Sequence, residues 1–406
     1  MAKKSGGISA SDVRRVKKVM KKAKKNPGFR NFLIFIVIVA LIIAAVYFLH
    51  VKGYITLPFV GDSTGDSGTR TTATTVATTH GGEVHTIESD ELTINFLELG
   101  NWYTGDCTFI KAGDTDILID AGSRTGSIET ISKFIDGYCT DGILEYVIVT
   151  HAHQDHYAGF AGTASIPSIF DRYECEVVID FALSNNQSSS MYKKYQTNLA
   201  KEVESGAVHY TAAQCIESGN DTFSLADGID LTILDSYYYY NKSSDENNYS
   251  VCCMITQGEH NFLFTGDLEK EGEEHLVQMN DLPEVDVFKG GHHGSKTSSN
   301  DCLLSVIRPD VVCVCCCCGS DEYTDVNDNQ FPTQAFIDRV SKYTDRVYVT
   351  TLSTDNDSKT YTSMNGNITV HSKQGTQITL SFSGNDIKLK DTSWFKKNRT
   401  TPPDWA

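Results

Sequence analysis

The stretch EYVIVTHAHQDHYAGF, residues 145–160, joins a short apolar run to a cluster of potential metal ligands. Its first part is rich in β-branched residues and predicts a buried strand. The loop that follows carries His151, His153, Asp155 and His156, residue types that a borderline-soft divalent ion prefers. In an extended loop His151 and His153 project the same way and share one ion, while Asp155 and His156 turn towards a second. The alternative to a metal site is a polar loop whose histidines only form hydrogen bonds. Such a loop would not require this spacing of ligands.

Two later motifs repeat the arrangement of a strand followed by ligands. FLFTGDLE places Asp267 in a glycine turn, where a carboxylate can bridge two metal ions through its two oxygens. VDVFKGGHHGSKTSS places His292 and His293 in a second glycine-rich turn. We favour His293 as the ligand and His292 as an acid/base group, and the reverse assignment stays open.

Three further residues are expected to serve the site. Asp120, in ILIDAG, follows another predicted strand and is expected to fix a ligand imidazole by accepting its hydrogen bond; an Asx turn is the alternative. With Asp155 and His292, we count Asp120 among the catalytic residues. Ser295 and Lys296 are weaker candidates that would hold a substrate phosphate, and a solvated lysine at a helix start explains Lys296 equally well.

The chain around these motifs alternates predicted strands and helices. Strands are expected at 92–97, 108–111, 115–119, 177–180, 229–234, 250–256, 261–265, 285–289, 347–350, 368–371 and 377–382, with helices at 127–134, 268–279 and 333–343. This alternation indicates a layered α/β domain. Five of the twelve cysteines lie in PDVVCVCCCCG, which reads as a buried strand with small apolar side chains rather than as disulfides or a zinc cage.

The amino-terminal part of the chain predicts a membrane anchor. Residues 1–30 carry eleven Lys or Arg and one Asp, so this basic segment has a net charge of +10. Because the net charge of the whole chain is −17, the remaining residues carry −17 − 10 = −27. Residues 32–49, FLIFIVIVALIIAAVYFL, are apolar and would span about 27 Å as a helix. We expect an uncleaved single-pass anchor over 31–51, a cytoplasmic amino terminus, and an extracellular catalytic domain. A Ser/Thr/Gly-rich stalk over 52–86, a hydrolase domain over 87–390 and a tail over 391–406 complete the expected organisation.

The motifs together resemble the metallo-β-lactamase superfamily, and within it the extracellular hydrolase domain of the competence protein ComEC. The resemblance runs through LGNWYTGDCTFI, DILIDAG, THAHQDHYAG, NNYSVCCMI, FLFTGDLE and VDVFKGGHHGSKTSS in that order. It implies a four-layer αββα sandwich that holds two divalent metal ions, zinc or alternatively manganese, and a metal-activated water that hydrolyses an ester or phosphodiester. The chain departs from the family in two places. His209 and His260 stand where a further ligand is often found but in no recognisable context, and Phe331-Pro332 replaces a His-Pro pair.

These features favour hydrolysis of phosphodiester bonds at the cell surface. A ComEC-like nuclease and a cell-wall phosphodiesterase are two versions of this function. The −27 charge disfavours nucleic acid as the partner, because polyanion binding depends on Lys and Arg neutralising phosphates. The alternatives are a lactone or ester hydrolase of the same fold and a non-catalytic surface binding protein. The run Tyr237–Tyr240 is either a carbohydrate platform or part of a loop rim.

Overall fold

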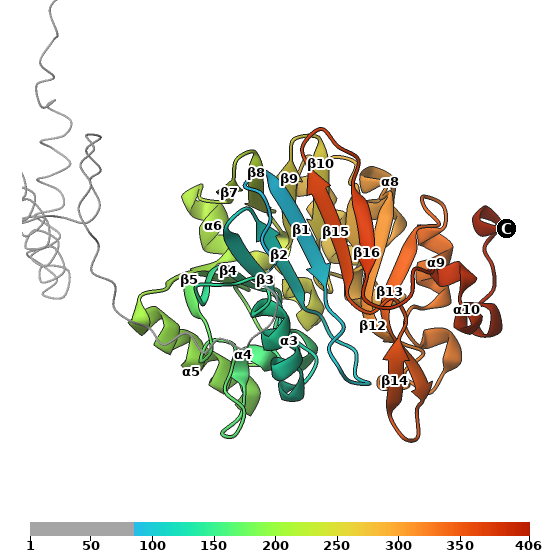
Figure 1. The fold of residues 1–406 in the computed structure, drawn as a ribbon, viewed down its shortest axis with the longest axis horizontal. Helices are drawn as coiled ribbons and strands as arrows, with labels where there is room; N and C mark the ends of the chain where they lie inside the picture. Colours follow the sequence, from blue (N-terminus) through green and yellow to red (C-terminus); the bar gives the residue numbers. More distant parts are fainter. Residues whose placement is uncertain (1–84) are drawn as a thin grey trace, which may run out of the picture. The chain divides into compact units, whose positions relative to one another are not determined.

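The computed structural model describes residues 85–406, which form two eight-stranded sheets packed face to face between helices (Figure 1). The strands of the first sheet are β1 (Glu91–Phe96), β2 (Thr108–Ala112), β3 (Thr115–Ile119), β4 (Ile143–Val149), β5 (Glu174–Asp180), β6 (Val208–Thr211), β15 (Ile368–Lys373) and β16 (Thr379–Phe382). The strands of the second are β7 (Thr222–Ala226), β8 (Ile229–Ile233), β9 (Cys253–Gln257), β10 (His260–Phe264), β11 (Val287–Lys289), β12 (Val311–Cys318), β13 (Val347–Asp355) and β14 (Thr360–Ser363). Their orders are β16-β15-β1-β2-β3-β4-β5-β6 and β14-β13-β12-β11-β10-β9-β8-β7.

The helices form the two outer layers. They are α3 (Ile128–Ile135), α4 (Gln154–Ala161), α5 (Ser190–Ser205), α6 (Ala212–Ser218), α7 (Lys270–Met279), α8 (Asp301–Ile307), α9 (Gln334–Val340) and α10 (Ser393–Asn398). Helices α3 to α6 contribute to the core cluster that also fills the space between the sheets. Helices α7 to α10 pack in a second cluster on the outer face of the second sheet. The αββα layering that the resemblance implied is therefore observed.

The cysteine-rich strand β12 shows how the two core clusters are built. Its side chains alternate between the two faces of the second sheet, so that Cys313 and Cys315 lie in the cluster between the sheets while Cys316 and Cys318 lie in the second cluster on the outer face. All twelve cysteines are free, and burial raises the pKa of the Cys316 and Cys318 thiols well above its usual value. The run therefore serves as small apolar packing, as predicted.

The direction of the strands places the functional loops at one edge of the sandwich. Strands β3 and β4 are parallel in the first sheet, and β10, β11 and β12 are parallel in the second. The segments that follow parallel strands emerge at the same edge of a sheet. Asp120, His151, Asp267 and His292 each follow one of these strands, so their loops meet.

Several boundaries differ from those predicted. The residues after 390 are not a separate tail, because Phe395 and Trp405 are buried in the second core cluster. Their apolar side chains lie among polar residues without periodicity, so this packing could not be predicted from the local sequence. Helices α5 and α6 were also not predicted.

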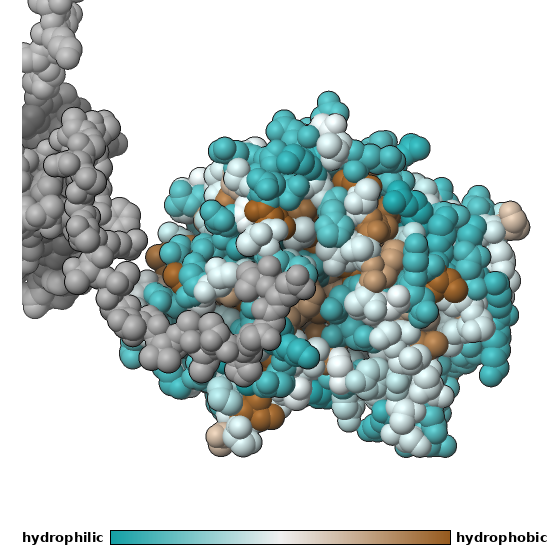
Figure 2. All heavy atoms as spheres, viewed as in Figure 1, coloured by the Kyte–Doolittle hydropathy of each residue, from teal (hydrophilic) through white to brown (hydrophobic). Residues whose placement is uncertain are grey.

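On the face shown in Figure 2, hydrophilic side chains predominate and hydrophobic ones form small separate patches.

The predicted basic segment, the anchor over 31–51 and nearly all of the stalk lie outside the described residues. Within residues 85–406, no helix combines the length and the apolar character that crossing a membrane requires.

Candidate metal centre

Three loops of the first sheet are joined by backbone hydrogen bonds into one rigid frame. The Asp106 amide donates to the Asp155 carbonyl at 3.0 Å, and the Gly122 amide donates to the Asp106 carbonyl at 2.9 Å. The Ala121 amide donates to the His156 carbonyl at 2.7 Å. A Cβ atom at Gly122 would lie 1.5 Å from the Asp155 carbonyl oxygen, so only glycine allows this approach. The loops after β3 and β4 are therefore held in a fixed relative position.

The HxHxDH motif changes conformation along its length. His151 and His153 lie in the short segment between β4 and α4, and His153, whose backbone is extended, is the residue before α4. Asp155 and His156 belong to the first turn of α4 and are buried. The strand end and the helix start thus direct four side chains into one volume from a single short segment.

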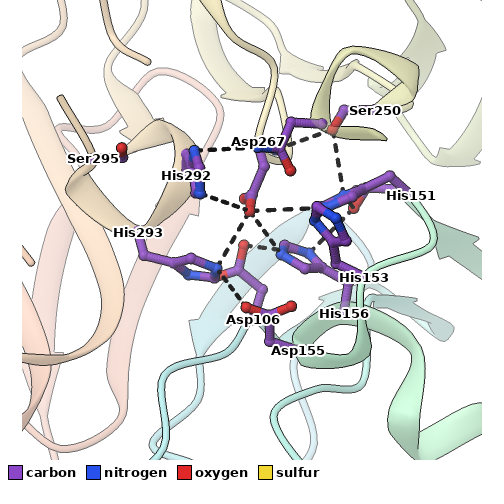
Figure 3. Close-up of polar contacts among 12 residues, drawn as sticks. Asp106, His151, His153, Asp155, His156, Ser250, Asp267, His292, His293 and Ser295 are labelled. Atoms are coloured by element: carbon purple, nitrogen blue, oxygen red, sulfur yellow. Dashed lines mark hydrogen bonds and ion pairs between the residues drawn. The ribbon is translucent and has the colours of Figure 1, made fainter. Parts of the chain in front are cut away.

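The HHGS turn of the second sheet has a strained backbone. His292 and His293 both have positive φ, 46° and 55°, a region that residues other than glycine seldom adopt. Two successive left-handed residues make a sharp turn after β11, and both imidazoles face the Asp267 carboxylate (Figure 3). Strain of this kind persists only where the surrounding structure holds it, and it is concentrated at functional sites.

One carboxylate oxygen, Oδ2 of Asp267, stands at the centre of the site (Figure 3). Four imidazole Nε2 atoms surround it, at 3.1 Å for His156, 3.4 Å for His293, 3.8 Å for His151 and 3.8 Å for His292. The convergence of nitrogens from both sheets on one carboxylate is the arrangement expected of a carboxylate that bridges metal ions.

The remaining motif residues lie on either side of this centre. The Nδ1 atom of His153 is 3.0 Å from the Nε2 atom of His151, so these two rings point to one position. The Oδ2 atom of Asp155 is 3.5 Å from the Nε2 atom of His293. His156 lies between the two predicted groups, because its ring centroid is 4.1 Å from that of His151 and 5.1 Å from that of His293. The division of the residues between two ions therefore stays a prediction. His293, the ligand favoured from the sequence, is buried with its Nε2 atom 3.4 Å from Oδ2 of Asp267. Its role as a ligand remains a prediction.

Two carboxylates lie behind the imidazoles rather than in front of them. Asp120 accepts a hydrogen bond from Nδ1 of His156 at 2.8 Å, which is the contact predicted for it. Asp106 lies 3.1 Å from Nδ1 of His293 and was not predicted. One atom each of Asp106, His156, Asp267 and His293 lies within 4.8 Å of the others, which would allow Asp106 to be a ligand. Asp106 approaches each imidazole at Nδ1, away from the Nε2 atoms that face Asp267, and Nδ1 of His293 also lies 2.9 Å from the Cys315 carbonyl oxygen. We therefore assign Asp106 to a position behind the His293 ring, as a neighbouring negative charge rather than a ligand.

The electrostatics of the site follow from burying several charges together. Burial would raise the pKa of the Asp267 carboxyl, but the surrounding His156, His293 and His292 hold that pKa well below its usual range. Burial would lower the pKa of His156, but Asp267 and Asp120 raise it well above its usual value. Burial and the neighbouring His156 lower the pKa of His151 well below its usual value. The centre therefore attracts positive charge, which protons or a metal ion can supply.

The donor set fits divalent cations. Four buried carboxylates lie together at the centre, those of Asp106, Asp120, Asp155 and Asp267. Among the described residues, the one Lys or Arg that contacts them is the buried Lys289, whose ammonium group pairs with Asp106. Oδ1 of Asp267 and Nε2 of His293 are buried and have no hydrogen-bond partner. Buried unpaired acceptors of this kind are costly unless a cation satisfies them. A mixed imidazole and carboxylate set suits zinc and also suits manganese.

The structure leaves other sequence candidates outside the centre. Oγ of Ser295 bonds to Thr297 within its own turn, and Nζ of Lys296 bonds to Oδ1 of Asn329 at the surface. Neither makes a polar contact with the ligand group, so a substrate role for them remains a prediction. His209 pairs with Asp180, and His260 pairs with an aspartate before β11, so each has a partner of its own away from Asp267.

Sequence reasoning missed three residues at the site: Asp106, Lys289 and Tyr323. One signal was available for Asp106, because the tripeptide TGD occurs at 104–106 as well as at 265–267. Lys289 lies within β11, and its burial against Asp106 became visible only in the fold. Tyr323 belongs to the loop after β12, and its hydroxyl donates a short hydrogen bond to Oδ2 of Asp155.

Comparison with known proteins agrees with this geometry. The family model described as "Metallo-beta-lactamase superfamily" matches residues 100–168, which hold Asp106, Asp120 and the HxHxDH motif. Recombination protein 2 of Haemophilus influenzae is 31% identical over 263 residues, covering 64% of this chain and 28% of that protein. These matches support a ComEC-like protein of the metallo-β-lactamase superfamily.

Two further relatives are similar to this ComEC-like chain over shorter stretches. Competence protein ComA of Neisseria gonorrhoeae is 33% identical over 130 residues, which are 31% of this chain and 17% of that protein. ComE operon protein 3 of Bacillus subtilis is 36% identical over 66 residues, which are 16% of this chain and 8% of that protein. The chain thus spans less than a third of the length of each of these relatives.

Proposed function

We propose that this ComEC-like chain is a metal-dependent phosphodiesterase whose catalytic domain is held at the outer face of the cell membrane. The observation that carries the proposal is the convergence of four imidazole Nε2 atoms on Oδ2 of Asp267, with partnerless buried atoms beside it. The superfamily is generally hydrolytic, and sites for two metal ions suit in-line displacement at phosphorus.

The chain's own residues would divide the work. His151, His153, Asp155, His156, Asp267 and His293 would hold the ions. Bound ions supply Lewis acidity and lower the pKa of a water molecule. Asp120 fixes the orientation of His156 through Nδ1, and the Cys315 carbonyl oxygen, 2.9 Å from Nδ1 of His293, fixes that of His293.

We assign His292 to proton transfer rather than to tight metal binding. Its side chain is 20% exposed, whereas that of His293 is 1% exposed. Its Nδ1 atom lies 3.1 Å from Oγ1 of Thr297, which fixes the ring, and burial lowers its pKa. A neutral imidazole at the open side of the centre can take a proton from water or pass one to a leaving group.

The charge of the domain favours a small or wall-attached diester over a polynucleotide. Residues 31–406 carry −27, and a surface of that sign repels a polyanion unless a local basic groove offsets it. A small diester has one negative charge to accommodate, which bound metal ions would neutralise. The anchor over 31–51 rests on the sequence and would keep the domain close to substrates in the cell envelope.

A nuclease is the second candidate. The names of the relatives, a recombination protein and a competence protein, favour nucleic acid as a substrate. Those relatives are much longer than this chain, so their complete activities do not carry over.

The test is hydrolysis by the full-length chain in detergent, loaded with zinc or manganese. Bis(para-nitrophenyl) phosphate and single-stranded DNA would be offered to the wild type, to Asp155→Asn, and to Asp114→Asn as a matched control in the exposed β2–β3 turn. We expect turnover of the small diester by the wild type and by Asp114→Asn, and its loss in Asp155→Asn. Cleavage of DNA at a comparable rate would favour the nuclease. No turnover of either substrate by the fully metal-loaded chain would refute a phosphodiesterase.

A further inference from the structure

The loop after β12 places a tyrosine over the metal centre. Tyr323 is 53% exposed, yet its hydroxyl group reaches Oδ2 of Asp155. Asp155 lies beside His293 and Asp267 on the side of the centre that also carries His156. The aromatic ring of Tyr323 is therefore accessible to solvent, while its hydroxyl group contacts a predicted metal ligand.

The ring of Tyr323 belongs to an aromatic wall. It packs against Phe331 with ring centroids 5.6 Å apart. The Phe331 ring in turn lies 5.8 Å from the ring of His292 and 5.9 Å from that of His293. Phe331 stands where the resemblance leads one to expect a histidine, so this part of the wall has no hydrogen-bonding group. The Tyr323 hydroxyl is the polar group that these two aromatic residues offer to the site.

The neighbouring residue fixes the position of this loop. The carboxylate of Glu322 pairs with Arg124 at 2.5 Å and accepts the Thr104 amide at 2.8 Å. Arg124 also lies over the Tyr103 ring, 4.3 Å from its centroid. These contacts tie the loop to the segment that leads into Asp106, so the hydroxyl is positioned before a substrate arrives.

We propose that the Tyr323 hydroxyl is a catalytic hydrogen-bond donor to a non-bridging phosphoryl oxygen of the substrate; this deepens the proposed function and rests on it. The negative charge of a transferring phosphoryl group is spread over its equatorial oxygens, and a neutral donor stabilises that charge. Asp155 marks the place, since the hydroxyl already donates to an anionic oxygen there. The competing role, in which Tyr323 only positions Asp155 as a ligand, predicts a different response to mutation.

The test compares Tyr323→Phe with the wild type in the full-length, zinc-loaded chain. Phenylalanine removes the hydroxyl and keeps the ring against Phe331. Tyr361→Phe is the matched control, because Tyr361 is an exposed tyrosine on the separate strand β14. Three quantities are measured: kcat and KM for bis(para-nitrophenyl) phosphate, inhibition by inorganic phosphate, and zinc affinity by chelator competition.

We expect Tyr323→Phe to lower kcat on the order of a hundredfold, the usual cost of losing one oxyanion donor, and to weaken phosphate inhibition about tenfold. Zinc affinity should match that of the wild type, and Tyr361→Phe should be unchanged throughout. Wild-type values of kcat and phosphate inhibition in Tyr323→Phe would overturn the inference while leaving the proposed function intact. Loss of zinc affinity would also overturn it, since that result marks a positioning residue. Failure of the zinc-loaded wild type to turn over the diester would instead overturn the proposed function itself.

Discussion

Replacing Asp120 with asparagine tests how the metal centre is oriented. The Asp120 carboxylate accepts three hydrogen bonds: from the Thr150 amide at 2.8 Å, from the Thr150 hydroxyl at 2.7 Å and from Nδ1 of His156 at 2.8 Å. Asparagine keeps one acceptor oxygen and turns the other into an NH2 donor. With its oxygen towards the Thr150 amide, the new NH2 group faces Nδ1 of His156.

The expected consequence is a change of tautomer. Nδ1 of His156 would then have to accept a hydrogen bond, which moves the ring proton to Nε2, the atom 3.1 Å from Asp267. A protonated Nε2 cannot ligate an ion. Loss of an outer carboxylate of this kind typically lowers metal affinity about 10- to 100-fold, or about 1.4–2.7 kcal/mol.

The assay is zinc affinity of the full-length variant, measured by competition with a chromogenic chelator. Asp286→Asn is a matched control, since Asp286 also pairs with an imidazole, Nδ1 of His260 at 3.0 Å, and with a backbone amide, but away from the centre. We expect Asp120→Asn to lose zinc affinity and Asp286→Asn to keep it. Equal affinities in the wild type and Asp120→Asn would refute the argument that Asp120 sets the His156 tautomer.

Three further predictions concern stability, measured by urea unfolding. Lys289→Met leaves the buried Asp106 carboxylate without its ammonium partner and should cost about 3–5 kcal/mol, with partial rescue in the double variant that also carries Asp106→Asn; additive losses would contradict the pairing. Gly122→Ala should prevent folding or displace the loop, because the added Cβ meets backbone at 1.5 Å, whereas Gly126→Ala has open space and should fold normally. Burial lowers the pKa of His209, but its partner Asp180 raises it by more, so the net shift is upward. The charged pair therefore stabilises the fold fully below the unfolded-state pKa of the histidine, and this contribution is lost as pH rises through the folded-state pKa. His209→Gln should therefore lose more stability near pH 6 than near pH 8, and an equal loss at both values would refute the assignment.

The parts of the site that could be predicted share one simple rule. His151, Asp267 and His292 each follow an apolar strand, and parallel strands bring such positions to one edge, so local sequence was sufficient to group them. Spacing also predicted that His151 and His153 would lie apart from Asp155 and His156, because extended and turning backbone direct side chains differently. In the fold the rings of His151 and His156 lie only 4.1 Å apart, so this division stays a prediction. The buried strand β12 could also be predicted, because a run of small apolar residues is stable in a fold only where it is buried.

The parts that could not be predicted depend on contacts between distant segments. Asp106 precedes a strand instead of following one, so the rule passed over it although the TGD tripeptide was repeated. Lys289 reads as an ordinary polar residue in a strand until the fold buries it against Asp106. Tyr323 reaches Asp155 across 168 residues of sequence, and its own loop has no periodic pattern. The carboxyl-terminal segment packs through Phe395 and Trp405, two residues too widely spaced to signal a helix face.

The central claim is that the imidazoles around Asp267 hold divalent ions. The most direct measurement is anomalous diffraction at the zinc edge from crystals grown with zinc. We predict two peaks beside the Asp267 carboxylate, one facing His151 and His153 and the other facing His156 and His293. A contrary result would be no peak at Asp267, or zinc bound only at the separate group of Asp116, Cys139 and Asp141 in the described residues.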